Sequence, residues 1–435
     1  MSEPRRAAHL PRIHPAAWHG QLGETVRKIS PYTEADPAAI LASLLGLFGA
    51  MAGDNAWVRV GGARHPARIW PLIIGKTGSG RKGTSLAEAR TAAHGWSTYA
   101  ANYARSRVVS GLASGEGLIA ALGGAIGSAA GDAEQQVAAP DGKLTVVETE
   151  FARVLAAAKR DGSTLGPILR QLWDDGAASI LTRAAPLSVQ HAHVAVIAHI
   201  TPQELRLRLA EADLAGGTLN RFLLIASERP HLIPHEARSR ADLAEPAEWI
   251  GKALEGARFA GGEVHRDKAA EALWEEVYAA LCDEEPDGQL GAVLARGPAY
   301  TMRLALAYAL ADQDGAIRPH HLLAGLAVWQ YAAATARRQF PDTSRDDVDR
   351  LARFIEQAPA GRSKTEISKL FGGNRNADQL RQLVGDLERK QRIKTVQEPA
   401  GKAGGRPVMR YKATGQHVDR MTDLLSKYER NESTI

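Results

Sequence analysis

The chain has 435 residues, of which 44% are hydrophobic and 24% charged, a balance typical of globular proteins with two or three domains. Its single cysteine, Cys282, excludes an intramolecular disulfide and a cysteine-ligated zinc site, and it favours a cytoplasmic location. We find no export signal at the start and no stretch near the ~18 uncharged apolar residues that span a bilayer, so we expect no membrane anchor.

The net charge of +5 is unevenly distributed along the sequence. Residues 345–435 carry 19 Lys and Arg against 13 Asp and Glu, which leaves the first 344 residues close to −1. This asymmetry predicts a polyanion-facing C-terminal domain attached to a nearly neutral body, although a modest positive balance is also common on ordinary solvated surfaces.

The first hundred residues indicate an α/β arrangement. Residues 1–35 are rich in Pro, His and Arg without clear periodicity, and we expect an extended, partly disordered N-terminal arm. A buried helix is predicted at 36–52, then a pair of strands at 56–60 and 68–74, then a helix at 84–106. Alternating strands and helices are typical of a parallel sheet covered by helices.

A glycine loop at residues 75–85, Gly-Lys-Thr-Gly-Ser-Gly-Arg-Lys-Gly-Thr-Ser, follows the second of these strands. Converging backbone N–H groups, a lysine, and a hydroxyl for Mg²⁺ at the start of a helix form a phosphate-binding loop. The spacing departs from GxxxxGK[ST], because Arg81 stands at the lysine position and Lys82 at the hydroxyl position. The alternative is a glycine-rich turn without a ligand.

We expect Lys82 to contact the phosphates, Thr84 or Ser85 to bind Mg²⁺, and Arg81 to make a second phosphate contact. The residues predicted to bind ATP are Gly75, Thr77, Gly78, Gly80, Arg81, Lys82, Gly83, Thr84 and Ser85.

Two carboxylates follow a strand predicted at 144–148. We assign Glu148, together with Thr84, to the Mg²⁺ site, the glutamate partly through water, and Glu150 to polarising the attacking water, and these two glutamate roles could be exchanged. An acid after a strand is also common for solubility alone, so the assignment depends on its position about 65 residues after the loop.

Three polar residues near the next strands are further candidates. Thr201 follows a strand at 193–199 and is expected to cap a helix, and it is also placed to sense the γ-phosphate. Arg221 begins a buried strand and is predicted to act as an arginine finger on a neighbouring subunit, or to form an ion pair with Glu228 or Asp213. Arg303, on an otherwise apolar helix, is a weaker candidate for the same role as Arg221, and an ordinary surface position is favoured for it.

After the N-terminal arm, the sequence divides into four parts. Residues 36–235 are expected to form the core, 236–342 a helical, lid-like extension, 343–415 a winged helix, and 416–435 a tail. A helix, a helix-turn-helix and a β-hairpin in that order place the second helix in a DNA major groove and the hairpin tip on phosphates. Winged helices also serve as protein–protein modules. The predicted DNA contacts are Asn374, Arg375, Asn376, Gln379, Arg381, Gln382, Lys402 and Arg406.

The middle of the chain resembles a family of P-loop proteins from actinobacterial genomes, phages and plasmids, related to the helicase-like halves of primase-helicases. The motifs that carry the resemblance are the loop from Gly75, Ser-Gly-Glu-Gly-Leu-Ile from Ser114, Val-Val-Glu-Thr-Glu-Phe-Ala-Arg-Val-Leu from Val146, Ile-Thr-Pro-Gln-Glu-Leu from Ile200, and Asn-Arg-Phe-Leu from Asn220. They extend over about 37–338, and the family shares the unusual Arg-Lys-Gly-Thr loop. The resemblance implies an ATPase core tied to replication of mobile DNA.

The expected fold is therefore an α/β P-loop NTPase core of RecA/AAA+ type with a parallel sheet, a helical extension and a C-terminal winged helix. The expected function is an ATP- and Mg²⁺-dependent motor or switch on DNA, such as a replicative helicase or initiator of a mobile element, acting as a homo-oligomeric ring such as a hexamer. The alternatives are a nucleotide-sensing DNA-binding regulator with a degenerate ATPase site, and a small-molecule kinase.

Overall fold

The computed structural model of the chain describes residues 10–123, 142–181, 186–208, 217–235, 241–283, 288–340, 343–372, 375–389, 392–398, 408–414 and 424–425. The chain divides into two compact units, Met1–Gln339 and Phe340–Ile435, and each is described by itself.

The first unit is built on a five-stranded sheet with the order β4-β5-β8-β3-β9. Its strands are β3 (Pro71–Ile74), β4 (Val108–Val109), β5 (Lys143–Glu148), β8 (His193–Ile200) and β9 (Leu223–Ala226). All its strand pairs are parallel. Every residue of β3, β5, β8 and β9 is buried, as expected for a parallel sheet covered on both faces. The predicted α/β class is confirmed.

The register of the strands sets which residues share the carboxyl edge of the sheet. Ile74 at the end of β3 pairs with Ile200 of β8 and with Ala226 of β9. Glu148 at the end of β5 pairs with Ala198, two positions before the end of β8. The segments that follow these four strands therefore leave the sheet at the same edge, where open α/β sheets bind ligands.

Helix α2 (Pro37–Ala52) is the buried helix that the sequence predicted. Asp36 caps it by accepting a hydrogen bond from the N–H of Ala38, and a proline occupies its first turn. The helix packs against the sheet. Gly49 permits this approach, because a Cβ there would lie 2.0 Å from the carbonyl oxygen of Ala67.

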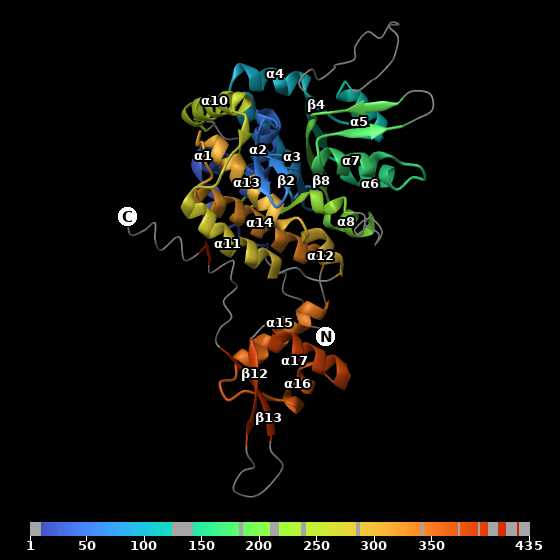
Figure 1. Cartoon of the computed structure of the whole chain (residues 1–435), viewed down its shortest axis with the longest axis vertical. Coiled ribbons are helices and arrows are strands. Elements are labelled where there is room, and N and C mark those ends of the chain that lie inside the picture. Colours follow the sequence, from blue (N-terminus) through green and yellow to red (C-terminus); the bar gives the residue numbers. More distant parts are fainter. Residues whose placement is uncertain are drawn as a thin grey trace, which may run out of the picture. The chain divides into compact units, whose positions relative to one another are not determined.

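Further helices surround the sheet, and Figure 1 shows α5, α6 and α7, in green, on the opposite side of it from α1, α10, α13 and α14. They are α1 (Gly20–Ile29), α3 (Lys82–His94), α4 (Thr98–Ser106), α5 (Gly115–Ala121), α6 (Phe151–Ala158), α7 (Leu165–Asp174), α8 (Pro202–Arg208), α10 (Ala244–Phe259), α11 (Lys268–Asp283), α12 (Gly288–Leu294), α13 (Gly297–Ala311) and α14 (Pro319–Gln339), with the short 3₁₀ helices η1 (Pro15–Trp18), η2 (Ser30–Tyr32) and η3 (Leu219–Arg221).

Two local predictions for the first hundred residues are wrong. In its described part the expected extended arm is helical, because α1 has an apolar face with Leu22, Val26 and Ile29 buried. The expected single helix at 84–106 is two helices. Helix α3 ends at His94, and Ser97 starts α4 by accepting a hydrogen bond from the N–H of Ala100.

The predicted strand pair is also wrong in its partner. Strand β1 (Ala56–Val60) pairs in antiparallel fashion with β2 (Ala63–Pro66), and in parallel with the short β10 (Gly262–Glu263). The intervening Gly61 has a φ of 57°, which suits a tight hairpin turn. A second small hairpin, β6 (Ala178–Ile180) and β7 (Leu187–Val189), was not predicted.

The helical segment expected at 236–342 packs directly on the sheet within the first unit. The hydroxyl of Tyr331 on α14 donates to the carbonyl of Ala226 at 2.9 Å, and the N–H of Ala226 donates to the hydroxyl of Thr335 at 3.3 Å. These bonds attach α14 to the last residue of β9. The segment therefore belongs to the same compact unit as the sheet.

The second unit contains α15 (Thr343–Glu356), β11 (Arg362–Ser363), α16 (Lys364–Leu370), α17 (Ala377–Arg389), β12 (Ile393–Glu398) and β13 (Val408–Ala413). Its strands form an antiparallel sheet with the order β11-β13-β12. The buried side chains of Leu351, Ile355, Ile367, Leu387 and Ile393 form its core. Across both units, the described residues include no helix long and apolar enough to cross a bilayer.

Candidate functional site

The glycine loop lies at the carboxyl edge of the sheet, between β3 and α3. It is closed by hydrogen bonds from the N–H of Gly80 to the carbonyl of Lys76 at 2.9 Å and from the hydroxyl of Ser227 to the carbonyl of Gly80 at 2.7 Å. A Cβ on Gly75 would lie 2.6 Å from the carbonyl oxygen of Ser227, and one on Gly80 would lie 2.6 Å from that of Lys76. Glycine is therefore required at both positions for this closed shape.

Lys82 is the cation that points back over the loop. Its Nζ donates to the carbonyl of Gly75 at 2.6 Å and to that of Lys76 at 3.4 Å. Partial burial lowers the pKa of Lys82, although the Glu204 carboxylate acts in the opposite direction. The geometry therefore brings Lys82 to the loop, in agreement with the register chosen from the sequence.

Arg81 points elsewhere. Its backbone is left-handed, with a φ of 44°, and its guanidinium forms an ion pair with Glu34. The same carboxylate accepts a hydrogen bond from the N–H of Ile233 at 2.8 Å and lies 3.7 Å from the guanidinium of Arg229. The hydrogen bond from Ile233 is the main cause of the lowered pKa of Glu34. The structure therefore does not bring Arg81 to the loop as the expected second phosphate contact.

The structure separates the two candidate hydroxyls for Mg²⁺. Ser85 is fully buried, and its Oγ donates to the carbonyl of Lys82 at 2.8 Å. Thr84, one residue earlier in the first turn of α3, is partly exposed. Gly83 is exposed, with no atom within 4 Å of a hypothetical Cβ. Thr84 is therefore the accessible hydroxyl. Of the other loop residues, Thr77 and Gly78 are exposed.

Glu148 lies at the same edge as the loop, two strands away. It is buried at the end of β5, and its Oε1 accepts hydrogen bonds from the N–H groups of Gly111 and Leu112 at 2.7 and 2.5 Å. These donors fix the direction of the carboxylate. Glu150 is exposed and immediately precedes α6, with no side-chain hydrogen bond to the start of that helix.

His199 and Glu204 are close enough to Lys82 to interact with it electrostatically. His199 is 2% exposed, and its Nε2 is buried without a hydrogen-bond partner. Burial, followed by the charge of Lys82, lowers the pKa of His199 to about 4. Its imidazole is therefore neutral at pH 7, with an unsatisfied ring nitrogen beside the β3–β8 edge.

Thr201 caps α8, as the sequence predicted. Its Oγ1 accepts a hydrogen bond from the N–H of Glu204 at 3.2 Å and donates to the Glu204 carboxylate at 2.8 Å. The carboxylate also accepts from the N–H of Thr201 at 3.0 Å. These reciprocal bonds form a capping box.

Arg221 lies at the opposite, amino edge of the sheet, just before β9. It is 6% exposed, and it forms an ion pair with Asp174 and donates a hydrogen bond to the carbonyl of Gly217. Arg296 lies 3.2 Å from the other oxygen of Asp174. The partner is Asp174 and not Glu228, and Asp213, the other partner that the sequence suggested, lies outside the described residues. The side chain is not presented to solvent as an arginine finger would be.

The surface position expected for Arg303 is wrong. The side chain is fully buried, and it donates hydrogen bonds to the carbonyls of Arg68 and Trp173 at 3.1 and 3.2 Å. Its guanidinium lies 3.7 Å from the centre of the Trp173 ring. Burial is the main cause that lowers the pKa of Arg303 well below its ordinary value. The buried carbonyls around the guanidinium explain why an arginine is stable at this buried position. The hydrophobic periodicity of the sequence does not reveal such carbonyls.

In the second unit, several predicted DNA contacts already have internal partners. Asn376 caps α17 by accepting from the N–H of Gln379 at 2.9 Å, and the Gln379 side chain accepts from the N–H of Asn376 at 3.0 Å. Arg375 forms an ion pair with Asp347, and the exposed Arg381 with Asp378. Gln382 is exposed on α17. The predicted contacts Asn374, Lys402 and Arg406 lie outside the described residues.

Sequence reasoning missed Glu34, Glu204 and Ser227 as neighbours of the loop. Ser227 had a detectable signal, since it directly follows a buried strand, as Glu148 ends one. Glu34 had none, because its segment was expected to be an extended arm.

No family model matches the chain, and no curated protein matches it.

Proposed function

We propose that the chain is a P-loop ATPase that acts on DNA as a motor or switch, with a winged helix in its second unit. The observation that supports this most is the position of Lys82 Nζ over the carbonyl of Gly75, at the carboxyl edge of a parallel sheet. A lysine held by its own loop carbonyls has exchangeable partners, so phosphate oxygens can replace them at the start of α3.

Lys82 would hold the phosphates of ATP, and Thr84 and Glu148 would face its Mg²⁺, directly or through water. The bound ion neutralises charge on the triphosphate and so favours attack by water. The chain's own contributions are the rigid loop, the direction of Glu148 set by two backbone N–H groups, and the exposed Glu150, which is free to orient water.

DNA association rests on the second unit. Its order of helices and strands, with the sheet β11-β13-β12, supports the proposed winged helix, and residues 345–435 have a net charge of +6. Helix α17 is proposed to enter the major groove of DNA, and Arg381 and Gln382 are exposed on it.

A nucleotide-sensing regulator with little turnover is the second candidate. The observation that favours it is the irregular loop, in which Arg81 is left-handed and Gly83 stands directly after the lysine, where a hydroxyl is usual. Both candidates predict ATP binding, and they differ in turnover.

The test is ATP binding by calorimetry together with phosphate release, with and without single- and double-stranded DNA. We expect binding that Lys82→Ala weakens at least tenfold. Lys76→Ala is the matched control, because Lys76 lies in the same loop but is exposed, and it should leave binding unchanged. Absence of ATP binding by the parent protein contradicts both candidates, and binding without release at any DNA concentration favours the regulator.

A further inference from the structure

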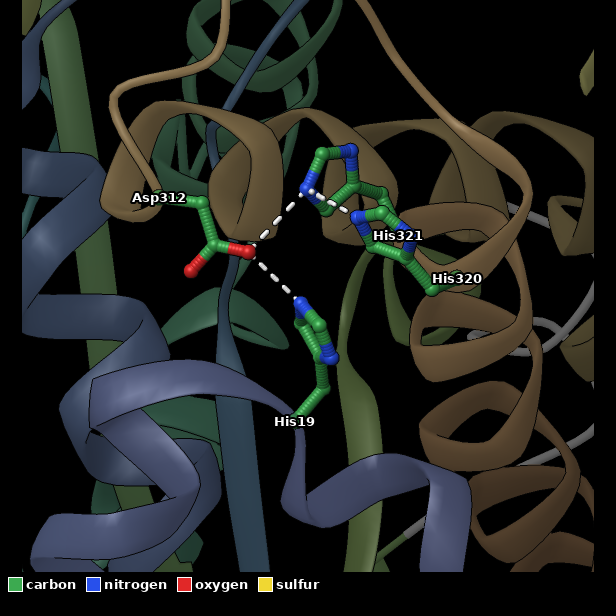
Figure 2. A group of neighbouring side chains, drawn as sticks. All are labelled: His19, Asp312, His320 and His321. Atoms are coloured by element: carbon green, nitrogen blue, oxygen red, sulfur yellow. Dashed lines mark hydrogen bonds and ion pairs between the residues drawn. The ribbon is translucent and has the colours of Figure 1, made fainter. Parts of the chain in front are cut away.

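Four side chains outside the loop region place metal-ligating atoms close together. They are His19, Asp312, His320 and His321, whose ligand atoms all lie within 4.8 Å of one another (Figure 2). His19 lies between η1 and α1, Asp312 directly after α13, and the other two histidines in the first turn of α14. Three segments far apart in the sequence therefore meet at this cluster.

Asp312 lies at the centre of the contacts. Its Oδ2 is 2.6 Å from the Nε2 of His19 and 3.1 Å from the Nε2 of His321. His320 contacts the cluster through His321, because its Nε2 lies 3.1 Å from the Nε2 of His321. Gly20 makes the approach possible, because a Cβ there would lie 2.5 Å from Asp312 Oδ1.

The hydrogen bonds of His321 distinguish it from the other two histidines. Its Nδ1 accepts a hydrogen bond from the N–H of Arg318 at 3.0 Å. This nitrogen is therefore unprotonated, and the proton of the neutral ring is on Nε2, which donates to Asp312. A fully buried ring held in this way orients the carboxylate, as histidines and carboxylates around metal ligands do for one another.

We propose that His19 Nε2, His320 Nε2 and Asp312 Oδ2 bind a divalent transition-metal ion such as Zn²⁺, with His321 as the positioning residue for Asp312. Two imidazoles and one carboxylate form a donor set that suits Zn²⁺ and leaves a coordination position for water. Metal–ligand distances of ~2.0–2.2 Å separate the ligands of one tetrahedral ion by ~3.3 Å. The largest separation between ligand atoms in the cluster is 4.8 Å. Side-chain shifts of about an ångström would therefore bring the ligand atoms to the spacing that one ion requires.

The position of the cluster indicates a structural role. His19 and Asp312 are 293 residues apart in the sequence, and a metal bound by both connects the N-terminal helices to α13 and α14. An ion that binds the folded chain more tightly than the unfolded one stabilises the fold. The inference does not depend on the proposed function, because the cluster shares no residue with the glycine loop.

The test uses the untagged, full-length protein prepared without chelator. We expect about one Zn²⁺ per chain by elemental analysis, a thermal midpoint that falls on treatment with EDTA, and recovery of the midpoint on adding Zn²⁺. Addition of Co²⁺ to the stripped protein should give the visible absorption bands of a four- or five-coordinate site, a readout that requires no variant.

The variants separate the ligands from the positioning residue. His19→Ala and His320→Ala, both at partly exposed positions, should abolish the Zn²⁺-dependent rise in the midpoint, whereas His321→Ala should weaken Zn²⁺ binding about 10- to 100-fold. His265→Ala, at an exposed histidine beside Glu263, is the control and should leave the rise unchanged. If the parent protein shows neither Co²⁺ bands nor a Zn²⁺-dependent midpoint, the cluster is only a hydrogen-bond network and the proposal is wrong.

Discussion

Both edges of the central sheet hold buried or half-buried cations, but the groups that bind these cations differ between the two edges. At the amino edge, Arg303 and Arg221 are bound by main-chain carbonyls, the Trp173 ring and the Asp174 carboxylate. At the carboxyl edge, Lys82 is held by two carbonyls of its own loop. Burial of a cation therefore does not by itself indicate a ligand site. The carbonyls that hold Lys82 belong to its own loop and can be replaced by a ligand, whereas Arg221 and Arg303 are also bound by the Asp174 carboxylate or the Trp173 ring.

The largest expected effect is at the amino edge. Arg303→Met should lower the free energy of unfolding by about 2–6 kcal/mol, because it leaves the buried carbonyls of Arg68 and Trp173 without this donor, at about 1–3 kcal/mol each. Urea unfolding measures this value. Arg59→Ala is the control, since Arg59 forms an exposed pair with Glu263 and should cost less than about 1 kcal/mol. A fully stable Arg303→Met protein with altered ATP turnover would contradict this comparison, because Arg303 would then serve activity and not stability.

Acid should destabilise the protein through a buried histidine at each edge of the sheet, and the contribution of the carboxyl edge can be isolated at His199. The pKa of His199 is about 4 in the folded chain against an ordinary 6.5, with burial the main cause. The unfolded chain therefore takes up a proton first, and stability is lost as the pH falls from about 6.5 towards 4.

From this shift we expect the parent protein to lose about 2 kcal/mol more than His199→Gln between pH 7 and pH 5. Urea unfolding at the two pH values gives both numbers. Burial also lowers the pKa of His65 to about 3 at the amino edge, so the variant should retain some acid sensitivity. Equal losses in parent and variant would show that His199 is protonated alike in the folded and unfolded states.

The smallest expected effect concerns Thr201 at the carboxyl edge. Thr201→Ala removes both hydroxyl bonds of the capping box and should destabilise the protein by about 1 kcal/mol. If Thr201 serves only as a cap, phosphate release should be unchanged under saturating ATP. Thr201→Ser retains the hydroxyl and is the matched control. Loss of turnover in Thr201→Ala without loss of stability would instead support the sensing role.

The sequence allowed the sheet and the position of its loop to be predicted because buried parallel strands are continuous apolar runs. β5 and β8 match the expected strands at 144–148 and 193–199 within one residue at each end. The structure places Lys82 Nζ at the loop carbonyls, and its role as the phosphate-binding lysine stays a prediction. The N-terminal arm was mispredicted because the apolar face of α1 is formed by only a few spaced residues, Leu22, Val26 and Ile29 among them.

The partners of the charged residues could not be predicted from the sequence. Arg303 bonds to carbonyls of residues 68 and 173, and Arg81 to a carboxylate at 34. Such contacts depend on how helices and loops pack in three dimensions, and no local pattern encodes them. Asn376 and Gln379 are a different case. They were predicted to contact DNA, although their spacing of three residues before a helix is the local pattern of a capping box, and their side chains form the bonds of such a box.

The ion pair between Arg81 and Glu34 means that the loop carries less free positive charge than its sequence suggests. The Glu34 carboxylate already forms an ion pair with the guanidinium of Arg81, and the guanidinium of Arg229 lies beside the same carboxylate. An incoming anion must therefore compete with Glu34 for Arg81, whereas the groups that accept hydrogen bonds from Lys82 are neutral carbonyls, with the Glu204 carboxylate acting on Lys82 only through its charge. Of the cations of the loop, Lys82 is therefore the one held over the loop carbonyls, Lys76 is exposed, and Arg81 is already paired.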